Sequence, residues 1–138
     1  MIEQSLLLIK PNATKKNHIG EILAIVEQNG LTIKKLKSFY FDLPLVSKFY
    51  AEHKGKEFYD RLTTFMMSGM IVAALVEKED AVPFLRDLVG DTYPEKRKPN
   101  TLRFLFADTI TENAVHASDT HDHALHEIAL IFPDNQSD

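Results

Sequence analysis

The residues with the clearest chemical potential lie in one stretch, Asn113 to Thr120 (NAVHASDT). His116 stands just ahead of a Ser-Asp-Thr sequence that favours a helix start, where unpaired backbone N–H groups and the helix dipole attract phosphate. Histidine titrates near pH 6.5, so at neutral pH much of it is uncharged and nucleophilic. A phosphoryl acceptor also needs one ring nitrogen fixed by a partner, and Ser118 and Glu127 are candidates. By spacing alone, a catalytic histidine and a histidine bonded at a helix cap are equally open.

A metal site is the alternative interpretation of the same region. Its candidate ligands are His116, His121, His123 and His126, with Asp119 or Asp122. His123 and His126 are spaced i, i+3 on the expected helix, and an aspartate could add an oxygen ligand. The spacing matches no compact zinc pattern, which makes metal ligation by these imidazoles the weaker hypothesis.

Composition indicates an ordinary globular chain. Its 138 residues, 44% hydrophobic and 26% charged, suit one domain over residues 1–138. No apolar run approaches the ~20 residues that cross a bilayer, and the start lacks the basic region of a secretory signal. Cysteine is absent, which excludes disulfides and thiolate chemistry. The net charge of −4 weighs against nucleic-acid binding. We therefore expect a cytoplasmic protein with neither a membrane nor a nucleic-acid partner.

Charge is distributed unevenly along the chain. All 16 Lys and Arg residues lie within positions 1–103, whereas positions 104–138 hold seven acidic residues and four of the six histidines. Folding must bring the basic part against the histidine-rich part if both serve one site. The final residues, 133–138, are expected to form a flexible, solubilising tail.

The apolar pattern predicts the elements that position these groups. Strands are expected at 5–9, 31–41, 70–76 and 128–132. Helices are expected from 17 to a stop at Gly30, at 44–53 behind Asp42, at 56–67, from a cap at Asp80 to Gly90, and from Asp119 to 127. Residues 91–103 form a long polar loop, and 102–107 suit either a strand or a short helix. This order predicts an α+β, ferredoxin-like βαββαβ sandwich with an antiparallel four-stranded sheet.

The glycines exclude the common phosphate cradles. None of the five is spaced as G-x-G-x-x-G, and Gly55-Lys56 lacks the rest of a Walker loop. No G-x-S-x-G elbow is present either. If this protein handles nucleoside phosphates, side chains must hold them.

Six segments in order resemble motifs of the nucleoside diphosphate kinase family, and the resemblance runs from about Ser5 to Phe132. Asn113 to Asp119 (NAVHASD) is similar to the N-x-x-H-G-S-D active-site signature. The other five matches are Lys10-Pro11 to K-P-D, Phe49-Tyr50 with His53-Lys54-Gly55 to H-Y-x-x-H-K, Ser68-Gly69 to S-G-P, Gly90 to Pro94 to G-x-T-N-P, and Lys98 to Arg103 to P-G-T-I-R.

The resemblance implies an enzyme that moves the γ-phosphoryl of a nucleoside triphosphate such as ATP to a nucleoside diphosphate. The mechanism would be ping-pong, through a phosphohistidine on His116 supported by Glu127 and Ser118. The further roles it implies are phosphate binding by Arg86, Thr92 and Arg103, contacts to the sugar and the transferred group by Lys10, Tyr50 and Asn113, and base contact by Phe58 with Leu62. Mg²⁺ would ride on the nucleotide phosphates, with Asp119 nearby through water.

The resemblance also implies a homo-oligomer, either a tetramer or a hexamer of dimers, and a short helix over 102–107. The physics agrees with these roles, because phosphoryl transfer needs positioning and cations, and guanidinium forks suit phosphate oxygens. Base contact by stacking predicts poor discrimination among nucleobases. A nucleotide-binding regulatory module with little turnover is the alternative function.

Several residues depart from the motifs without removing a proposed catalytic group. They are Asn12, Ala13, Met70, Tyr93, Asn100, Phe104, Leu105, Glu112 and Ala117. Ala117 adds a methyl group beside the histidine, and Asn100 stands where glycine is usual. We expect these changes to affect loop geometry, subunit contacts and rate more than the reaction.

Overall fold

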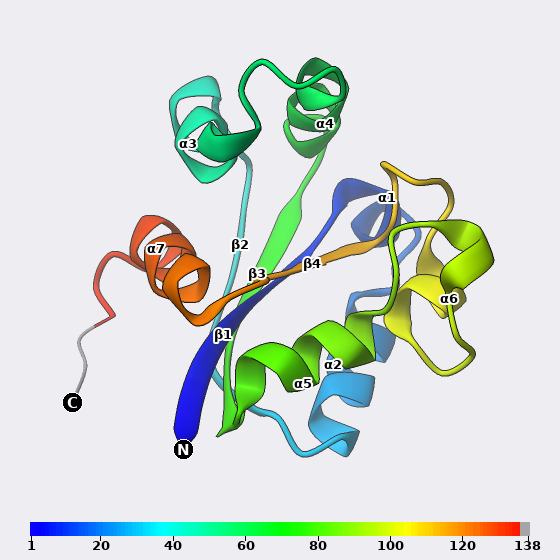
Figure 1. Cartoon of the computed structure of the whole chain (residues 1–138), viewed down its shortest axis with the longest axis vertical. Helices are drawn as coiled ribbons and strands as arrows, with labels where there is room; N and C mark the ends of the chain where they lie inside the picture. The colour runs from blue at the N-terminus through cyan, green and yellow to red at the C-terminus, as the bar shows by residue number, and fades with distance from the viewer. Residues whose placement is uncertain (136–138) are drawn as a thin grey trace.

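A four-stranded antiparallel sheet forms the centre of the molecule, with the strand order β2-β3-β1-β4 (Figure 1). The computed structural model describes residues 1–135. The strands are β1 (Ile2–Ile9), β2 (Thr32–Phe39), β3 (Ile71–Glu79) and β4 (Val115–Ala117). The helices are α1 (Pro11–Lys15), α2 (Ile19–Gln28), α3 (Leu43–Phe49), α4 (Tyr59–Met66), α5 (Ala81–Val89), α6 (Leu102–Phe106) and α7 (His121–Ile131), with 3₁₀ turns η1 (Ala51–His53) and η2 (Pro94–Lys96). The ferredoxin-like prediction is confirmed.

The two central strands are buried on both faces, which explains their nearly continuous apolar sequences. On one face, Leu7 and Ile9 pack with apolar residues of α2 and α5. On the other face, Leu6 and Leu8 pack with residues of α3, α4 and α7. Alternate residues of β1 therefore join both helical layers to one sheet (Figure 1).

The strand predicted at 128–132 is wrong. Residues 128–131 continue α7, where Ile128 and Ile131 lie one helical turn apart and pack into the core. The fourth strand is instead β4, which pairs with β1 through Leu8 and His116. Three residues are too few to show an alternating pattern, so this strand carried no periodic signal. Its effect on function is large, because it places His116 on an edge strand.

Several expected boundaries also differ. The turn after Lys10 contains a short helix, α1, and the helix expected at 44–53 divides into α3 and η1. The helix expected from residue 56 begins at Tyr59, while residues 102–106 form α6, as the family resemblance implies. Within the expected tail, residues 133–135 make a turn in which Asn135 N–H donates to Phe132 O at 2.9 Å. Residues 136–138 lie outside the described residues.

Two of the expected helix caps are replaced by other residues. Asp42 does cap α3, accepting a hydrogen bond from Leu45 N–H at 2.8 Å. Asp80 has a left-handed φ of 52° and makes no side-chain cap; the Glu3 carboxylate accepts from Val82 N–H at 2.8 Å instead. At α7, the capping side chain is Thr120 and not Asp119.

No helix among residues 1–135 has both the length and the apolar character to span a bilayer.

Gly90 lies where α5 ends beside Arg103, a residue expected to bind phosphate. It ends α5 with φ 89° and ψ −176°, a conformation that is essentially restricted to glycine. A β-carbon there would lie 2.6 Å from Thr101 Oγ1 and 2.7 Å from Thr101 Cβ. The Gly90 carbonyl also accepts a hydrogen bond from Arg103 Nη1 at 3.0 Å. The absence of a side chain at residue 90 therefore lets α5 end against the segment that carries Arg103.

Replacing Gly90 with Ala should lower the free energy of unfolding by about 2 kcal/mol or more, because backbone strain and the contact with Thr101 act together. Urea denaturation measures the change. Gly20→Ala is the matched control, since a β-carbon at this position in α2 meets nothing within 4 Å. It should leave stability unchanged or raise it by about 0.5–1 kcal/mol. Equal stability of the two variants would contradict the close approach at Gly90.

Candidate active site

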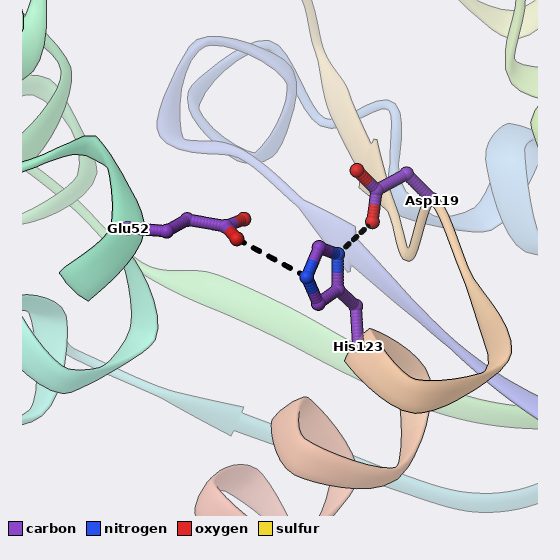
Figure 2. A group of neighbouring side chains, drawn as sticks. All are labelled: Glu52, Asp119 and His123. Atoms are coloured by element: carbon purple, nitrogen blue, oxygen red, sulfur yellow. Dashed lines mark hydrogen bonds and ion pairs between the residues drawn. The ribbon is translucent and has the colours of Figure 1, made fainter.

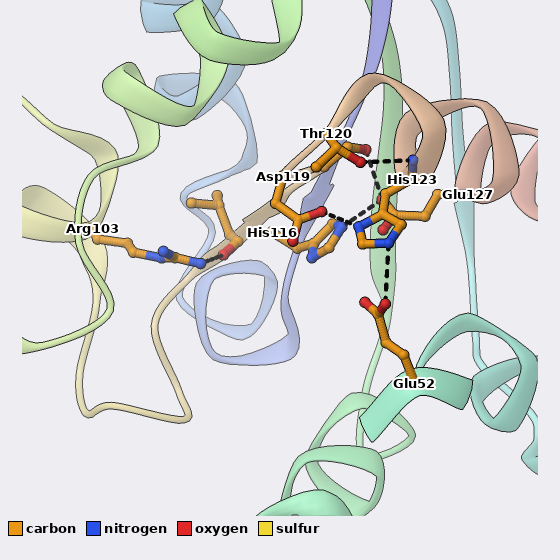
Figure 3. A network of polar contacts seen from close by, with 9 residues as sticks. Glu52, Arg103, His116, Asp119, Thr120, His123 and Glu127 are labelled. Carbon is orange, nitrogen blue, oxygen red and sulfur yellow. Dashed lines mark hydrogen bonds and ion pairs between the residues drawn. The ribbon is translucent and has the colours of Figure 1, made fainter. Parts of the chain in front are cut away.

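His116 is fixed by a buried carboxylate behind it. Its Nε2 lies 2.8 Å from Glu127 Oε1, and Ser118 Oγ donates to the same oxygen at 2.7 Å (Figure 3). Burial alone would raise the pKa of Glu127, but the charge and hydrogen bond of His116 and the bond from Ser118 lower it below its ordinary value. An ionised carboxylate only accepts, so Nε2 carries the proton and donates it. In the neutral form of the ring, Nδ1 then keeps its lone pair.

Aromatic rings restrict the orientation of the same imidazole. The Phe49 ring meets it edge-on at a centroid distance of 5.1 Å, and the Tyr50 ring at 6.3 Å. The His116 side chain nevertheless keeps 17% of its surface exposed. Glu127 thus holds the His116 ring at Nε2, and part of the ring remains accessible to a ligand.

His116 opens into a cavity of about 500 Å³. Its polar lining consists of Lys10, Tyr50, Arg61, Thr92, Arg103, Thr111, Asn113 and His116, and its apolar lining of Phe58, Leu62, Tyr93 and Ile110. Among residues 1–135, four buried side-chain polar atoms lack a hydrogen-bond partner, and three of them belong to this lining: Tyr50 OH, Arg103 Nε and Asn113 Oδ1. Because buried polar groups are normally paired, this concentration indicates a polar ligand.

The Arg103 side chain is held by hydrogen bonds to two separate segments of the chain. Its guanidinium donates to the carbonyl oxygens of Gly90 and Val115 at 3.0 Å each, and to Thr92 Oγ1 at 3.3 Å. Burial, followed by the charges of Arg86 and Arg97, lowers the Arg103 pKa to about 10. The group stays positively charged at neutral pH, in an orientation set by backbone oxygens.

Lys10 adds a second basic group, whose protonation can change near neutral pH. Its backbone N–H donates to Ala114 O at 2.7 Å, which holds the end of β1 beside the start of β4. Burial, with a smaller contribution from Arg103, lowers the Lys10 pKa to about 7. The phenol of Tyr50 is buried nearby, and burial together with the charge of Glu127 raises its pKa. Tyr50 therefore stays neutral, whereas Lys10 is ready to bind a proton when an anion arrives.

A basic cavity of about 530 Å³ adjoins the first and shares Thr92 and Arg103 with it. Arg86, Lys96 and Lys98 line this second cavity, with Asp87 and Asp91. Of the three residues expected to bind phosphate, Thr92 and Arg103 therefore face both cavities, and Arg86 lines only the second.

Comparison with known proteins identifies the family of this chain. The family model for nucleoside diphosphate kinase matches residues 3–137. The nucleoside diphosphate kinase of Actinobacillus pleuropneumoniae serotype 5b is 48% identical over 136 residues, covering 99% of each chain. That of Methanocaldococcus jannaschii is 40% identical, covering 99% of this chain and 97% of its own.

Two solved structures have the same fold and are more than 30% identical to this chain in sequence. The Aquifex aeolicus nucleoside diphosphate kinase has a TM-score of 0.92 at 39% identity and covers 96% of each chain. The Halobacterium salinarum enzyme, solved in complex with CDP, has a TM-score of 0.93 at 32% identity, covering 100% of this chain and 94% of that one. The chain belongs to the nucleoside diphosphate kinase family. It is a phosphotransferase that acts on nucleotides.

Asn12, a departure from the kinase motifs, makes a local hydrogen-bond network that includes the backbone carbonyl of Glu112. Asn12 Nδ2 donates to Asp108 Oδ2 at 2.8 Å and to Glu112 O at 3.0 Å, while Asn12 Oδ1 accepts from Ala114 N–H at 3.2 Å. Ala114 has a φ of 76°, which is rare for a residue other than glycine. The asparagine thus holds a strained turn directly before the strand that carries His116. Spacing in the sequence gave no signal for this contact.

The four-histidine metal site is not assembled. His116 contacts Glu127, and His121 Nδ1 lies 2.8 Å from Glu3 Oε2. Within residues 1–135, the side chains placed to share a metal are Glu52, Asp119 and His123, whose ligand atoms lie within 4.8 Å of one another (Figure 2). In this kinase, however, His123 contacts Asp119 through Nδ1 and Glu52 through Nε2, the latter at 3.1 Å. A ring that donates from both nitrogens is an imidazolium and has no lone pair for a metal.

This cluster joins the α3–α4 region to the loop after β4. The hydrogen bond to Asp119 raises the His123 pKa, burial acts in the opposite direction, and the charges of Asp119, Glu52 and Glu127 add to the rise. The Asp119 pKa is lowered, because the bond and charge of His123 outweigh its burial. A raised pKa means that the folded state binds the His123 proton more tightly than the unfolded state.

The stability that His123 contributes should be fully present below about pH 6.5 and lost as the pH rises through its raised pKa. For so exposed a pair the effect should be below about 1 kcal/mol. Thermal unfolding of the wild type and His123→Ser at pH 5.5, 6.5 and 8 measures it. In a Glu52→Gln/Asp119→Asn background, the same substitution should give no pH-dependent difference. A pH-dependent difference that persisted in that background would show that other groups cause it.

Proposed function

We propose that this kinase works by a ping-pong mechanism in which His116 carries the γ-phosphoryl from a nucleoside triphosphate such as ATP to a nucleoside diphosphate. The observation that carries the proposal is the contact between His116 Nε2 and the ionised Glu127 carboxylate, which leaves Nδ1 as a nucleophile in the cavity wall. Ser118 completes the support by donating to the same carboxylate.

In the first step, Nδ1 of His116 attacks the γ-phosphorus. A P–N bond forms, the P–O bond to the β-phosphate breaks, and the diphosphate leaves with that bonding pair. The ring becomes more positive as the P–N bond forms, and Glu127 stabilises that charge through Nε2–H. In the second step, a terminal oxygen of the acceptor diphosphate attacks the same phosphorus, and the P–N pair returns to Nδ1.

The cations provide the electrostatic part of catalysis. Arg103 and Thr92, which line both cavities, would hold phosphate oxygens, and Arg86 would contact them from the second cavity. Lys10 has a pKa of about 7 in the free protein, and phosphate oxygens nearby would keep it protonated. Tyr50 and Asn113 each have a buried oxygen without a hydrogen-bond partner, and these oxygens would contact the sugar and the transferred group.

The base would occupy the apolar end of the cavity, where Phe58 offers a ring face with Leu62 beside it. Stacking recognises any base, so this arrangement supports broad use of nucleoside tri- and diphosphates. The CDP complex of the Halobacterium salinarum relative supports a nucleoside diphosphate as a ligand.

Mg²⁺ fits this site as a companion of the nucleotide. The lining of the His116 cavity contains no carboxylate, while Asp119 offers a hard oxygen donor in the loop after Ser118. Nucleotide phosphates would hold the ion, with Asp119 reached through water. When bound, Mg²⁺ offsets the charge on the transferring phosphate. We also propose a cytoplasmic homo-oligomer, a tetramer or a hexamer of dimers, on the basis of the family resemblance.

Wild-type protein incubated with γ-labelled ATP should become labelled on His116, in a form that resists alkali and is lost in acid. His116→Ala should abolish both the label and phosphate exchange, because it removes the nitrogen proposed to accept the phosphoryl group. Label counting and a coupled assay with ATP and GDP measure the two effects.

His18→Ala is the matched control, since His18 is paired with Glu21 on α2 and does not line the cavity. It should keep both label and exchange. A His116→Ala protein that still labels itself and turns over at the wild-type rate would remove the assignment. Nucleotide binding with no exchange by the wild type would favour a regulatory module instead.

A further inference from the structure

Ala114 is the centre of a tight turn directly before β4. Its φ is 76°, and across it Val115 N–H donates to Asn113 O at 3.0 Å. A three-residue turn with this bond and a positive φ is the rare, strained form of the γ-turn. Such a backbone persists only where its surroundings hold it in place. The turn lies between Asn113 and His116, and both of these residues line the same cavity.

Two groups from the end of β1 and the start of α1 hold Ala114 at its backbone. Lys10 N–H donates to Ala114 O at 2.7 Å, and Ala114 N–H donates to Asn12 Oδ1 at 3.2 Å. The first bond joins two backbone groups, so it does not depend on the side chain of Lys10. The second bond is made by a side chain. The position of the turn therefore depends on which residue stands at position 12.

The Asn12 side chain must both accept and donate. The residue is 6% exposed, and its Nδ2 donates to Asp108 Oδ2 at 2.8 Å and to Glu112 O at 3.0 Å. A backbone N–H can only donate, whereas a backbone carbonyl and an ionised carboxylate can only accept. An amide satisfies partners of both kinds. A carboxylate of the same size would satisfy Ala114 alone and would leave two acceptors facing a third.

Asp108 makes this requirement strict. Its carboxylate also accepts a hydrogen bond from Lys16 Nζ, and the bonds from Lys16 and Asn12 lower the pKa of Asp108 despite some burial. The group is therefore ionised at neutral pH and has no proton to offer a carboxylate at position 12. The resembled K-P-D motif has aspartate at that position, whereas this chain combines asparagine with Asp108.

We propose that Asn12 is a positioning residue for phosphoryl transfer, because its amide, through Ala114, sets the places of Asn113 and His116 in the cavity wall. The inference rests on the proposed function, in which His116 takes the phosphoryl group. The attacking nitrogen must lie in line with the bond that breaks, and a small displacement of a reacting group slows transfer strongly. Nucleotide affinity depends instead on Arg103 and on the apolar end of the cavity. Loss of the amide should therefore lower the rate of transfer more than the affinity.

Asn12→Asp tests the proposal, since it keeps the size of the side chain and removes only the donor. We expect kcat to fall about tenfold or more, while the KM values for ATP and GDP stay within about twofold of the wild type. The single-turnover rate of label transfer from γ-labelled ATP to His116 should fall by the same factor. Rates are expressed per His116 that takes label at completion, so unfolded protein does not contribute. Asn12→Ala, which removes donor and acceptor without adding a charge, should show the same division between kcat and KM.

The double variant Asn12→Asp/Asp108→Asn exchanges the donor and the acceptor. The amide at position 108 can donate to the carboxylate at position 12, which still accepts from Ala114 N–H. Glu112 O keeps the bonds from the N–H groups of Asp108 and Thr109, at 2.8 and 3.1 Å. We expect the exchange to return kcat to within about threefold of the wild type, because the two substitutions act on one contact and are not additive.

Asn29→Asp is the matched control for the change of amide to carboxylate. Asn29 Nδ2 donates to Ile25 O at 2.8 Å at the end of α2, and Asn29 does not line the cavity. This variant should keep the wild-type kcat. Asp108→Asn alone still offers an oxygen to Asn12 Nδ2, and its kcat should stay within about twofold of the wild type.

A wild-type rate per labelled site in Asn12→Asp and Asn12→Ala would overturn the proposal, even if both variants unfolded at a lower temperature, because the role of Asn12 would then be structural only. A loss of kcat that the double variant does not recover would overturn it as well. Labelling of the wild type separates this inference from the proposed function. If the wild type takes label and the Asn12 variants transfer it equally fast, the role of Asn12 is wrong and the phosphohistidine stands. If the wild type takes no label, the proposed function itself is wrong.

Discussion

The hydrogen bond between Glu127 and His116 is the constraint on which the site depends. Glu127 is 7% exposed, and a carboxylate buried to that degree stays ionised only when donors compensate its lost hydration. His116 and Ser118 are those donors, and both contact a single oxygen. The carboxylate in turn fixes the tautomer of the ring. One interaction thus both stabilises the buried charge of Glu127 and orients the His116 ring, the proposed nucleophile.

Much of the fold could be predicted from the sequence, because β1 and β3 are long, buried and bounded by breaking residues. The error at residues 128–132 shows the limit: a short apolar run suits a strand or the last turn of a helix, and only packing against Leu6 and Leu8 decides between them. β4 was missed for the opposite reason. Its three residues are a strand only because Leu7, Leu8 and Ile9 offer a partner edge.

For the site, local motifs located His116, Ser118 and Glu127, because a helix start and one side chain further along that helix can be placed by counting residues. The contacts that hold the cavity together could not be found in this way. Asn12 bonds to Ala114, 102 residues away, and Arg103 bonds to Gly90 across a loop of irregular backbone. Contacts of this kind depend on how the loops close over the sheet, and no periodic pattern reports that.

Two basic side chains lie at the site although the chain as a whole is acidic. The protein carries a net charge of −4, yet Lys10 and Arg103 are both buried and line the same cavity, where the charge of Arg103 adds to burial in lowering the Lys10 pKa. Burying two cations without a carboxylate between them costs stability, since their hydration is lost and they repel. An anion with several oxygens would remove both costs together. The unpaired Arg103 Nε and the lowered Lys10 pKa have the same cause, which is that both cations are buried and incompletely compensated, and bound phosphate oxygens would supply the missing compensation.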